Sequence, residues 1–296
     1  LIPHPTFRRF KVGPYIADEP LADIGGDGAF QHSNWRRGDD GKWRIVDNEK
    51  FGLDWISAVA AWFGHEIRIS QNVPVGIIES HFGGSKLYCW MPRESLENSP
   101  EFTRDIIEPY RDQKKKWGDA YAAWQHDPNR DPNRPPTEPW KLSCLYNAMI
   151  APIAPLAMRG VIWYQGESNG GEGKSYYHKK HALVNGWRQA FQNKDLAFYW
   201  VQLANFQRPN PDPEGGDGWA KIREAQTEAL DNPHTGMAIA IDLADAHNPG
   251  DIHPRNKQDV GGRLAQWALN QTYSKKEFVA SGPLYESFKV EGDRIR

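Results

Sequence analysis

Apolar segments of strand length alternate with amphipathic segments of helix length over most of this chain, and this alternation constrains the fold more than any other feature. Strand-like runs are residues 6–12, 73–80, 160–165, 196–206 and 236–245. Helical spacing covers residues 54–67, 175–191, 218–230 and 256–273, and Asp54 is suited to cap the first of these helices. Strands that alternate with helices of this length indicate βαβ units. The sequence therefore predicts a three-layer α/β/α fold with a mostly parallel sheet.

The chain has 296 residues, enough for one large domain with a sizeable core. We expect this domain to cover residues 1–280, and residues 281–296 to begin a carboxyl-terminal β segment. Between about residues 95 and 140 the composition changes to charged helical sequence and then to a proline-rich stretch in which regular structure cannot form. This part is predicted to be a surface insertion.

Charge and apolar content exclude several classes of partner. The net charge is -2 with both signs mixed along the chain, which argues against nucleic acid or an anionic membrane surface as a partner. No run of 18 apolar residues is present, so no membrane-spanning segment is predicted. The two cysteines, Cys89 and Cys144, are too few for a disulfide framework.

Three loops rich in glycine and small polar residues follow predicted strands. Their sequences are "ESHFGGSK", "YQGESNGG" and "DLADAHNPGDIHP". Because the carboxyl ends of parallel strands lie at one edge of a sheet, and ligands bind there in open α/β sheets, the three loops are predicted to form a site together.

The second loop contains G-x-S-x-G around Ser168, the pattern of an α/β-hydrolase nucleophile elbow. Two observations count against that interpretation. Three glycines intervene before helical spacing resumes near Ser175, whereas an elbow leads directly into its helix. The acidic residues Asp242 and Asp245 also lie unusually close in sequence to His253 for that fold. The elbow remains an alternative.

Taken together, the three blocks resemble the sialate O-acetylesterase family of SGNH-type hydrolases. The sequence "VPVGIIESHFGGSKLYCWMP" is similar to the glycine-glycine block of that family, "GVIWYQGESN" to its third block and "DIHPRNKQDVGGRLAQWAL" to its histidine block. The resemblance extends from "FRRFKV" to the final "SGPLYESFKVEGDRIR", nearly the whole chain. It implies an SGNH-hydrolase-like fold of flavodoxin-like topology.

The resemblance also implies hydrolysis of O-acetyl esters on a sugar by a serine nucleophile and a histidine base, with no metal or other cofactor. The expected substrate is O-acetylated sialic acid, and next an acetylated xylan-type polysaccharide. An extracytoplasmic location is expected from the resemblance alone.

In the resembled family the nucleophile lies in a G-Q-S-N block that precedes the strand matched by "FRRFKV", and this block is missing here together with its amino-terminal strand. The nearest look-alike is Ser33 in "FQHSNW", for which an ordinary turn serine is the better interpretation. The chain opens without a methionine, which favours a fragment, or a processed chain with a separate chain that carries the nucleophile, over a noncatalytic sugar-binding relative. All three interpretations remain open.

His253 is the predicted base, because imidazole titrates near neutrality and "DIHP" matches the family. Asp251 is predicted to orient this imidazole, although SGNH enzymes generally space the aspartate three residues before the histidine rather than two. Asp242, Asp245 or a backbone carbonyl are the alternatives.

The developing oxyanion requires N–H donors. The expected donors are a backbone N–H of Gly83 or Gly84 and a side-chain amide, for which Gln165 is preferred over Asn169 because it directly follows the strand. Glu167 is expected to brace this loop as an acceptor. A metal site built from carboxylates and histidines of the third loop is a weaker alternative, since the ligands lack the fixed helical spacing of a dedicated site.

Overall fold

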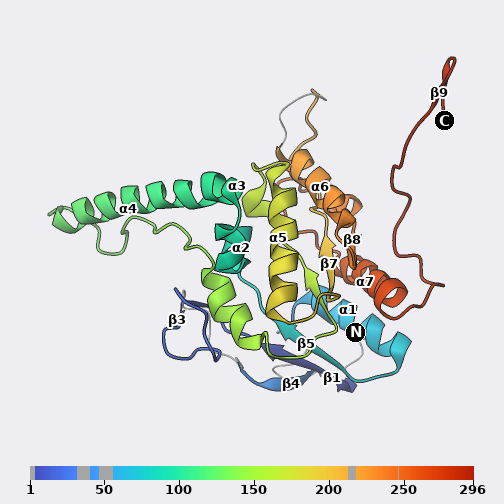
Figure 1. The fold of residues 1–296 in the computed structure, drawn as a ribbon, viewed down its shortest axis with the longest axis horizontal. Helices are drawn as coiled ribbons and strands as arrows, with labels where there is room; N and C mark the ends of the chain where they lie inside the picture. Colours follow the sequence, from blue (N-terminus) through green and yellow to red (C-terminus); the bar gives the residue numbers. More distant parts are fainter. Residues whose placement is uncertain (1–3, 32–40, 47–55, 213–217, 246) are drawn as a thin grey trace.

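The computed structural model describes residues 4–31, 41–46, 56–212, 218–245 and 247–296 (Figure 1). The strands are β1 (His4–Lys11), β2 (Tyr15–Ile16), β3 (Phe30–Gln31), β4 (Trp43–Val46), β5 (Val75–Glu79), β6 (Gly160–Trp163), β7 (Ala197–Val201), β8 (Thr235–Ala238), β9 (Val290–Glu291) and β10 (Arg294–Ile295). The α-helices are α1 (Ala58–Gln71), α2 (Arg93–Glu97), α3 (Pro100–Phe102), α4 (Glu108–His126), α5 (Ser175–Ala190), α6 (Gly218–Glu228) and α7 (Lys257–Trp267). Short 3-10 or π turns lie at Leu87–Trp90, Thr103–Ile107, Tyr146–Ile150, Ala151–Ile153, Glu167–Asn169, Ala229–Asp231, Ile241–Leu243 and Ala268–Thr272.

The long strands form two three-stranded sheets. In the order β4-β1-β5, β1 is antiparallel to β4 and parallel to β5, while β6-β7-β8 is parallel throughout. Among the described residues, no backbone ladder joins β5 to β6. The mostly parallel sheet was predicted, but its division into two hydrogen-bonded halves was not.

Strand β7 shows how the helical layers are placed. All five of its residues are buried, and side chains alternate between the two faces of a strand. Phe198 and Trp200 belong to one hydrophobic cluster, which also contains residues of α5 and α6, and Tyr199 belongs to a second cluster with residues of α1 and α7. Each such buried apolar side chain contributes about 1.5–3 kcal/mol. The predicted three-layer α/β/α fold is confirmed.

Helix α5 packs a mainly apolar face against the sheet, and Lys180 belongs to this buried face. Lys180 is completely buried, and its Nζ lies 4.9 Å from the centre of the Trp200 ring and 5.3 Å from that of Trp163. The ammonium has no hydrogen-bond partner among the described residues, and burial lowers the pKa of Lys180 well below its usual range.

The first long helix begins later than predicted. The Ser57 side chain accepts a hydrogen bond from the backbone N–H of Ala60, so Ser57 is the N-cap of α1, while Asp54 lies outside the described residues. At the end of α1, Asn72 takes a left-handed conformation, with φ of 51°, that ends the helix. Strand β8 is also shorter than predicted, because a 3-10 turn already begins at Ile241.

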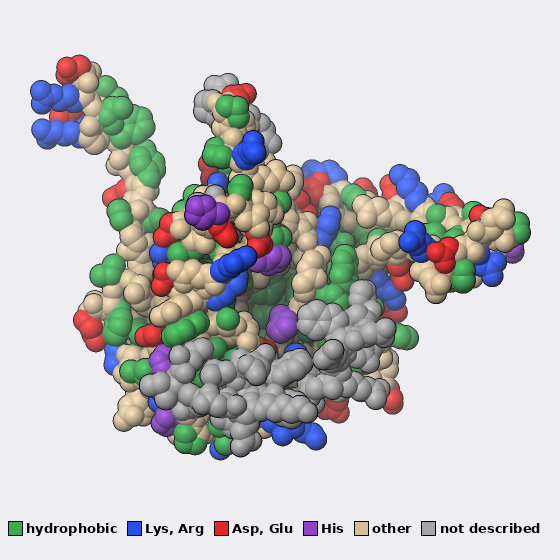
Figure 2. Space-filling view, turned by 180° about the vertical axis from the view of Figure 1, so that it is seen from behind, with side chains coloured by type: hydrophobic (Ala, Val, Ile, Leu, Met, Phe, Trp, Pro, Cys, Tyr) green, Lys and Arg blue, Asp and Glu red, His purple; other side chains and the backbone are tan. Residues whose placement is uncertain are grey.

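Beyond its first turn, helix α4 extends away from the body as a long arm together with the segment that returns to Trp140 (Figure 1), whereas Ile106 and Ile107 before it lie in the core. Helix α4 buries none of its residues, and the rings of Trp117, Tyr121 and Trp124 stack along it at spacings of 5.2 and 5.4 Å. The proline-rich segment that returns from the helix contacts this stripe at Trp117, whose indole donates to the backbone oxygen of Pro136. Charged side chains of both signs are interspersed along the arm (Figure 2).

The carboxyl-terminal segment also leaves the body and ends in the hairpin of β9 and β10 (Figure 1). Its apolar side chains Leu284, Tyr285 and Phe288 are exposed. Within the described parts of the chain, no helix combines the length and apolar character needed to cross a bilayer.

Candidate functional site

A cavity separates β5 from β6. One part of it, of ≈ 1060 Å³, lies at the carboxyl ends of these strands, and a second part of ≈ 400 Å³ continues toward their amino ends. Both parts are lined by Ile77 and Ile78 of β5 and by Ile162 and Trp163 of β6. The cavity therefore runs as a mainly apolar slot along the strands, at the position where the two halves of the sheet are not bonded. We call it the β5–β6 slot.

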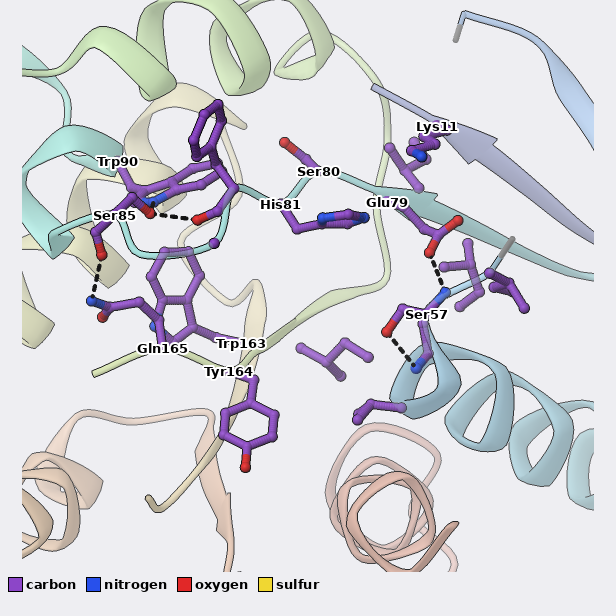
Figure 3. Close-up of a pocket in the computed structure, with 18 of the residues that line it drawn as sticks. Lys11, Ser57, Glu79, Ser80, His81, Ser85, Trp90, Trp163, Tyr164 and Gln165 are labelled. Atoms are coloured by element: carbon purple, nitrogen blue, oxygen red, sulfur yellow. Dashed lines mark hydrogen bonds between the residues drawn. The ribbon is translucent and has the colours of Figure 1, made fainter. Parts of the chain in front are cut away.

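The loop after β5 folds tightly at the open end of this slot. The Ser85 hydroxyl donates to the backbone oxygen of Phe82 at 2.7 Å and accepts from the Trp90 indole at 2.8 Å (Figure 3). Gly84 has a φ of 74°, a conformation that favours glycine, and Gly83 lines the cavity. A side chain at either glycine would meet no atom within 4 Å, so this backbone is open to an approaching ligand.

The loop after β6 is bonded to the loop after β5 at three places. Gln165 Nε2 donates to Ser85 O at 3.2 Å, Ser168 Oγ donates to Gly84 O at 2.9 Å, and the backbone N–H of Leu87 donates to Asn169 Oδ1 at 3.1 Å. Each of these bonds joins residues that are 80 to 84 positions apart in the sequence. The structure thus brings together two of the three loops singled out in the sequence.

The two amide side chains in the second loop differ in their hydrogen bonds and in their access to the cavity. Gln165 Nε2 donates two hydrogen bonds, one to Ser85 O and one to Asn169 Oδ1 at 2.6 Å. In contrast, Asn169 is buried and its Nδ2 has no hydrogen-bond partner among the described residues. Gln165 thus has both N–H groups engaged but lines the cavity, whereas Asn169 has an unbonded amide nitrogen that is buried away from it.

In the third loop, Asp251 contacts His253. Asp251 Oδ1 accepts from the backbone N–H of His253 at 2.8 Å and lies 3.2 Å from its Nδ1. These bonds lower the pKa of Asp251, the backbone bond most. Of the alternatives, Asp242 is bonded to the Arg263 guanidinium at 2.6 Å, and Asp245 accepts from the backbone N–H of His247.

The third loop approaches the second through Lys257, at the start of α7. Its Nζ lies 5.4 Å from the centre of the Tyr164 ring, and its charge is favoured by Glu167 and Asp251, although burial lowers the pKa of Lys257. His253 itself is 76% exposed, and both of its hydrogen bonds within the described residues go to Asp251. The imidazole thus stands at the surface, and within the described residues it has no hydrogen bond to Gln165 or to the two glycines.

Polar side chains at the end of β5 were not singled out in the sequence. Glu79 accepts from the backbone N–H of Ser57 at 2.5 Å and lies 3.7 Å from the buried Arg9 guanidinium, and burial raises its pKa (Figure 3). His81 and Lys11 also line the cavity. The protein atoms around the His81 imidazole and the charge of Lys11 lower the pKa of His81, even though this side chain faces the open cavity. Its position directly after a predicted strand was the signal that could have identified it.

Of the two serines considered as nucleophiles, only Ser168 lies in the described part of the chain. Ser168 lies in a 3-10 turn, and its hydroxyl is bonded to Gly84 O, with no histidine bonded to it in the described part of the chain. Ser33 lies outside the described residues. As for metals, no group of three or more His, Cys, Asp or Glu side chains is arranged to hold one within the described residues.

Comparison with known proteins identifies relatives of this chain. Residues 118–270 match the sequence profile of a family described as carbohydrate esterase, sialic acid-specific acetylesterase. The sialate O-acetylesterase of Mus musculus is 33% identical over 254 residues, covering 80% of this chain and 46% of that protein. The human sialate O-acetylesterase is 30% identical over 300 residues, covering 96% of this chain and 50% of that protein.

Among solved structures, a carbohydrate acetylesterase from Xanthomonas citri superposes with a TM-score of 0.71 and 31% identity, covering 98% of this chain and 54% of that chain. The present chain thus spans about half the length of the relatives that it matches. The expectation that a separate chain carries the nucleophile finds no support in these relatives.

Proposed function

Because this chain belongs to the carbohydrate esterase family of sialic acid-specific acetylesterases, we propose that it forms part of an enzyme that removes O-acetyl groups from sugars. The proposed substrate is O-acetylated sialic acid, and next an acetylated plant polysaccharide. The observation that supports it most is the cross-bonded pair of glycine-rich loops at the open end of the β5–β6 slot.

In the proposed reaction a serine Oγ attacks the acetyl carbonyl carbon while its proton passes to the His253 imidazole. The tetrahedral intermediate then collapses, the sugar oxygen leaves with the proton from His253, and water releases acetate from the acetyl-serine by the same steps. Asp251 holds the imidazole by its bond to Nδ1, so that Nε2 carries the proton to and from the reacting oxygen.

The oxyanion would lie against N–H donors from both cross-bonded loops. Gly83 and Gly84 are exposed, so their backbone N–H groups are the candidate main-chain donors, and Gln165, which lines the cavity, is the candidate side-chain donor. Removal of one such donor typically costs 10²–10³-fold in kcat. Glu167 would serve a supporting role through its electrostatic interaction with Lys257.

The serine would be delivered by a strand in the β5–β6 slot. The slot is bounded by parallel strands on both sides, and a strand there would join the two halves of the sheet and end between the loops after β5 and β6. Apolar side chains such as Ile77 and Ile162 suit the burial of a strand between two helical layers. We propose that this strand comes from sequence preceding Leu1 in the same polypeptide.

The test compares this chain with the protein expressed from its complete reading frame. We expect acetate release from O-acetylated sialic acid only when the slot strand is present, and slow hydrogen exchange of the slot-facing amides of β5 and β6 only then. A reagent that traps acyl-serines should label a serine outside residues 1–296. Sugar binding without acetate release would instead indicate a noncatalytic relative, and labelling at Ser168 would refute the proposed nucleophile.

A further inference from the structure

A lysine and a histidine share one wall of the cavity at the carboxyl ends of β1 and β5. Lys11 is the last residue of β1 and is in register with Glu79, the last residue of β5, and His81 follows Glu79 by two residues. Neighbouring strands lie about 4.8 Å apart, so the two side chains start close together. Both line the part of the cavity drawn in Figure 3. Burial and then the charge of Lys11 lower the pKa of His81, so the two groups also interact electrostatically.

This wall offers hydrogen-bond donors without a matching acceptor. Within the described residues, neither Lys11 nor His81 has a hydrogen bond or an ion pair. Glu79 is the one acidic side chain among the described residues that line this part of the cavity. Its side chain is directed elsewhere, because it accepts from the backbone N–H of Ser57 and lies 3.7 Å from the Arg9 guanidinium. Glu79 is also only 4% exposed, and burial raises its pKa, although the charge of Lys11 acts in the opposite direction.

We propose that Lys11 and His81 bind the carboxylate of an acidic sugar, and that this contact makes an acidic sugar the preferred substrate. The inference rests on the proposed function, because it assumes that the sugar of the acetyl ester occupies the cavity. An ammonium and an imidazole N–H both form strong bonds to a carboxylate. An anion between the two groups also offsets their mutual repulsion. Sialic acids and uronic acids share such a carboxylate, whereas xylose has none.

Two substrates that differ only in this carboxylate test the inference in the complete protein. O-acetylated sialic acid is compared with its carboxamide, which keeps the acetyl ester but has no charge. The KM of the wild type should be about tenfold lower for the acid, because hydrogen bonds between charged groups are stronger than those to a neutral amide. Lys11→Met should raise the KM for the acid to that for the amide, with both kcat values unchanged, as expected for a binding contact away from the reacting atoms.

Further variants separate this contact from general damage. Lys42→Met is the matched control, since Lys42 precedes β4 of the same sheet, is exposed and lines neither part of the cavity. It should leave each KM unchanged. His81→Gln keeps an N–H donor and should largely keep the preference for the acid, whereas His81→Leu should weaken it several-fold. Equal KM values for acid and amide in the wild type would overturn the inference, as would a loss of kcat with both substrates in Lys11→Met, which would assign Lys11 to the reacting ester.

Binding without turnover distinguishes this inference from the proposed function. Titration calorimetry measures the affinity of the complete protein for sialic acid without an acetyl group and for its carboxamide. Tighter binding of the acid that is lost in Lys11→Met, in a protein that releases no acetate, would refute the proposed function and uphold the carboxylate contact. Acetate release with equal affinity for acid and amide would do the reverse. The same titration with a uronic acid and its carboxamide identifies the sugar, because only an acid whose carboxylate reaches Lys11 loses affinity in Lys11→Met.

Discussion

Asp251 Oδ1 accepts the backbone N–H of His253 and lies 3.2 Å from Nδ1 of the same imidazole, so a two-residue spacing suffices for an aspartate-histidine pair. The backbone bond folds the loop back on itself and brings the carboxylate beside the ring. The same turn recurs at Asp245 and His247, where the backbone bond is 2.9 Å long. The repeat provides a control histidine in the same loop.

His253→Ala in the complete protein is expected to lower kcat about 10²–10⁴-fold, the range for loss of a general base. Asp251→Asn should cause a smaller decrease, because the imidazole is exposed and water can partly replace the carboxylate. Steady-state kinetics with an O-acetylated sugar measure both effects. His247→Ala should leave kcat unchanged, and a decrease as large as that of His253→Ala would remove the base from His253.

Ser168→Ala should reduce the activity only a few-fold. Its hydroxyl ties the loop after β6 to Gly84 O, and such a bond contributes about 1 kcal/mol. Ser175→Ala is a suitable control, because the Ser175 hydroxyl donates to the backbone oxygen of Glu172 at a similar distance of 3.0 Å. Thermal unfolding and acetate release measure the two variants, and complete loss of activity in Ser168→Ala alone would revive the elbow interpretation.

Substitutions at the two adjacent glycines should separate stability from activity. Gly84→Ala forces a side chain into a left-handed conformation and should lower the free energy of unfolding by about 1–2 kcal/mol. Gly83 has no such conformation and has open space around it, so Gly83→Ala should leave stability unchanged but lower kcat, because the methyl group lies where the substrate approaches. Equal activity of Gly83→Ala and wild type would place the oxyanion elsewhere.

Glu79 should make the stability fall as the pH rises above the ordinary glutamate pKa. Burial raises the pKa of Glu79, so in this pH window the folded state binds the proton that the unfolded state has released. The free energy of unfolding therefore decreases with increasing pH until the folded-state pKa is passed. Glu79→Gln should flatten this dependence in denaturant titrations at several pH values, and an unchanged slope would assign it to other groups.

The spacing of apolar residues along the sequence predicted the main helices and strands well. The uninterrupted apolar run at β7 and the apolar stripe of α5 follow directly from burial on a two-sided sheet, and both were found where expected. The start of α1 was misplaced because Asp and Ser are equally good caps, and the choice between them depends on tertiary contacts. Here Glu79 accepts the Ser57 N–H and thereby fixes the cap.

The location of the site could be predicted from the sequence, but its hydrogen bonds could not. The rule that loops at the carboxyl ends of parallel strands converge placed the loops after β5 and β6 together. Which amide reaches the cavity could not be read from the sequence, because Gln165 and Asn169 carry the same groups and differ only in burial and in their partners. The division of the sheet between β5 and β6 could not be predicted either, because an apolar run of strand length does not show which other strand it pairs with.

The β5–β6 slot also bears on how this chain behaves in solution. Two strand edges that face a cavity carry N–H and C=O groups ready to pair, and such edges recruit strands of other molecules when they are left uncovered. We expect residues 1–296, produced alone, to self-associate as the concentration rises. The solubility of this chain would then depend on the uncovered edges of β5 and β6 at the centre of the sheet and not on its outer surface.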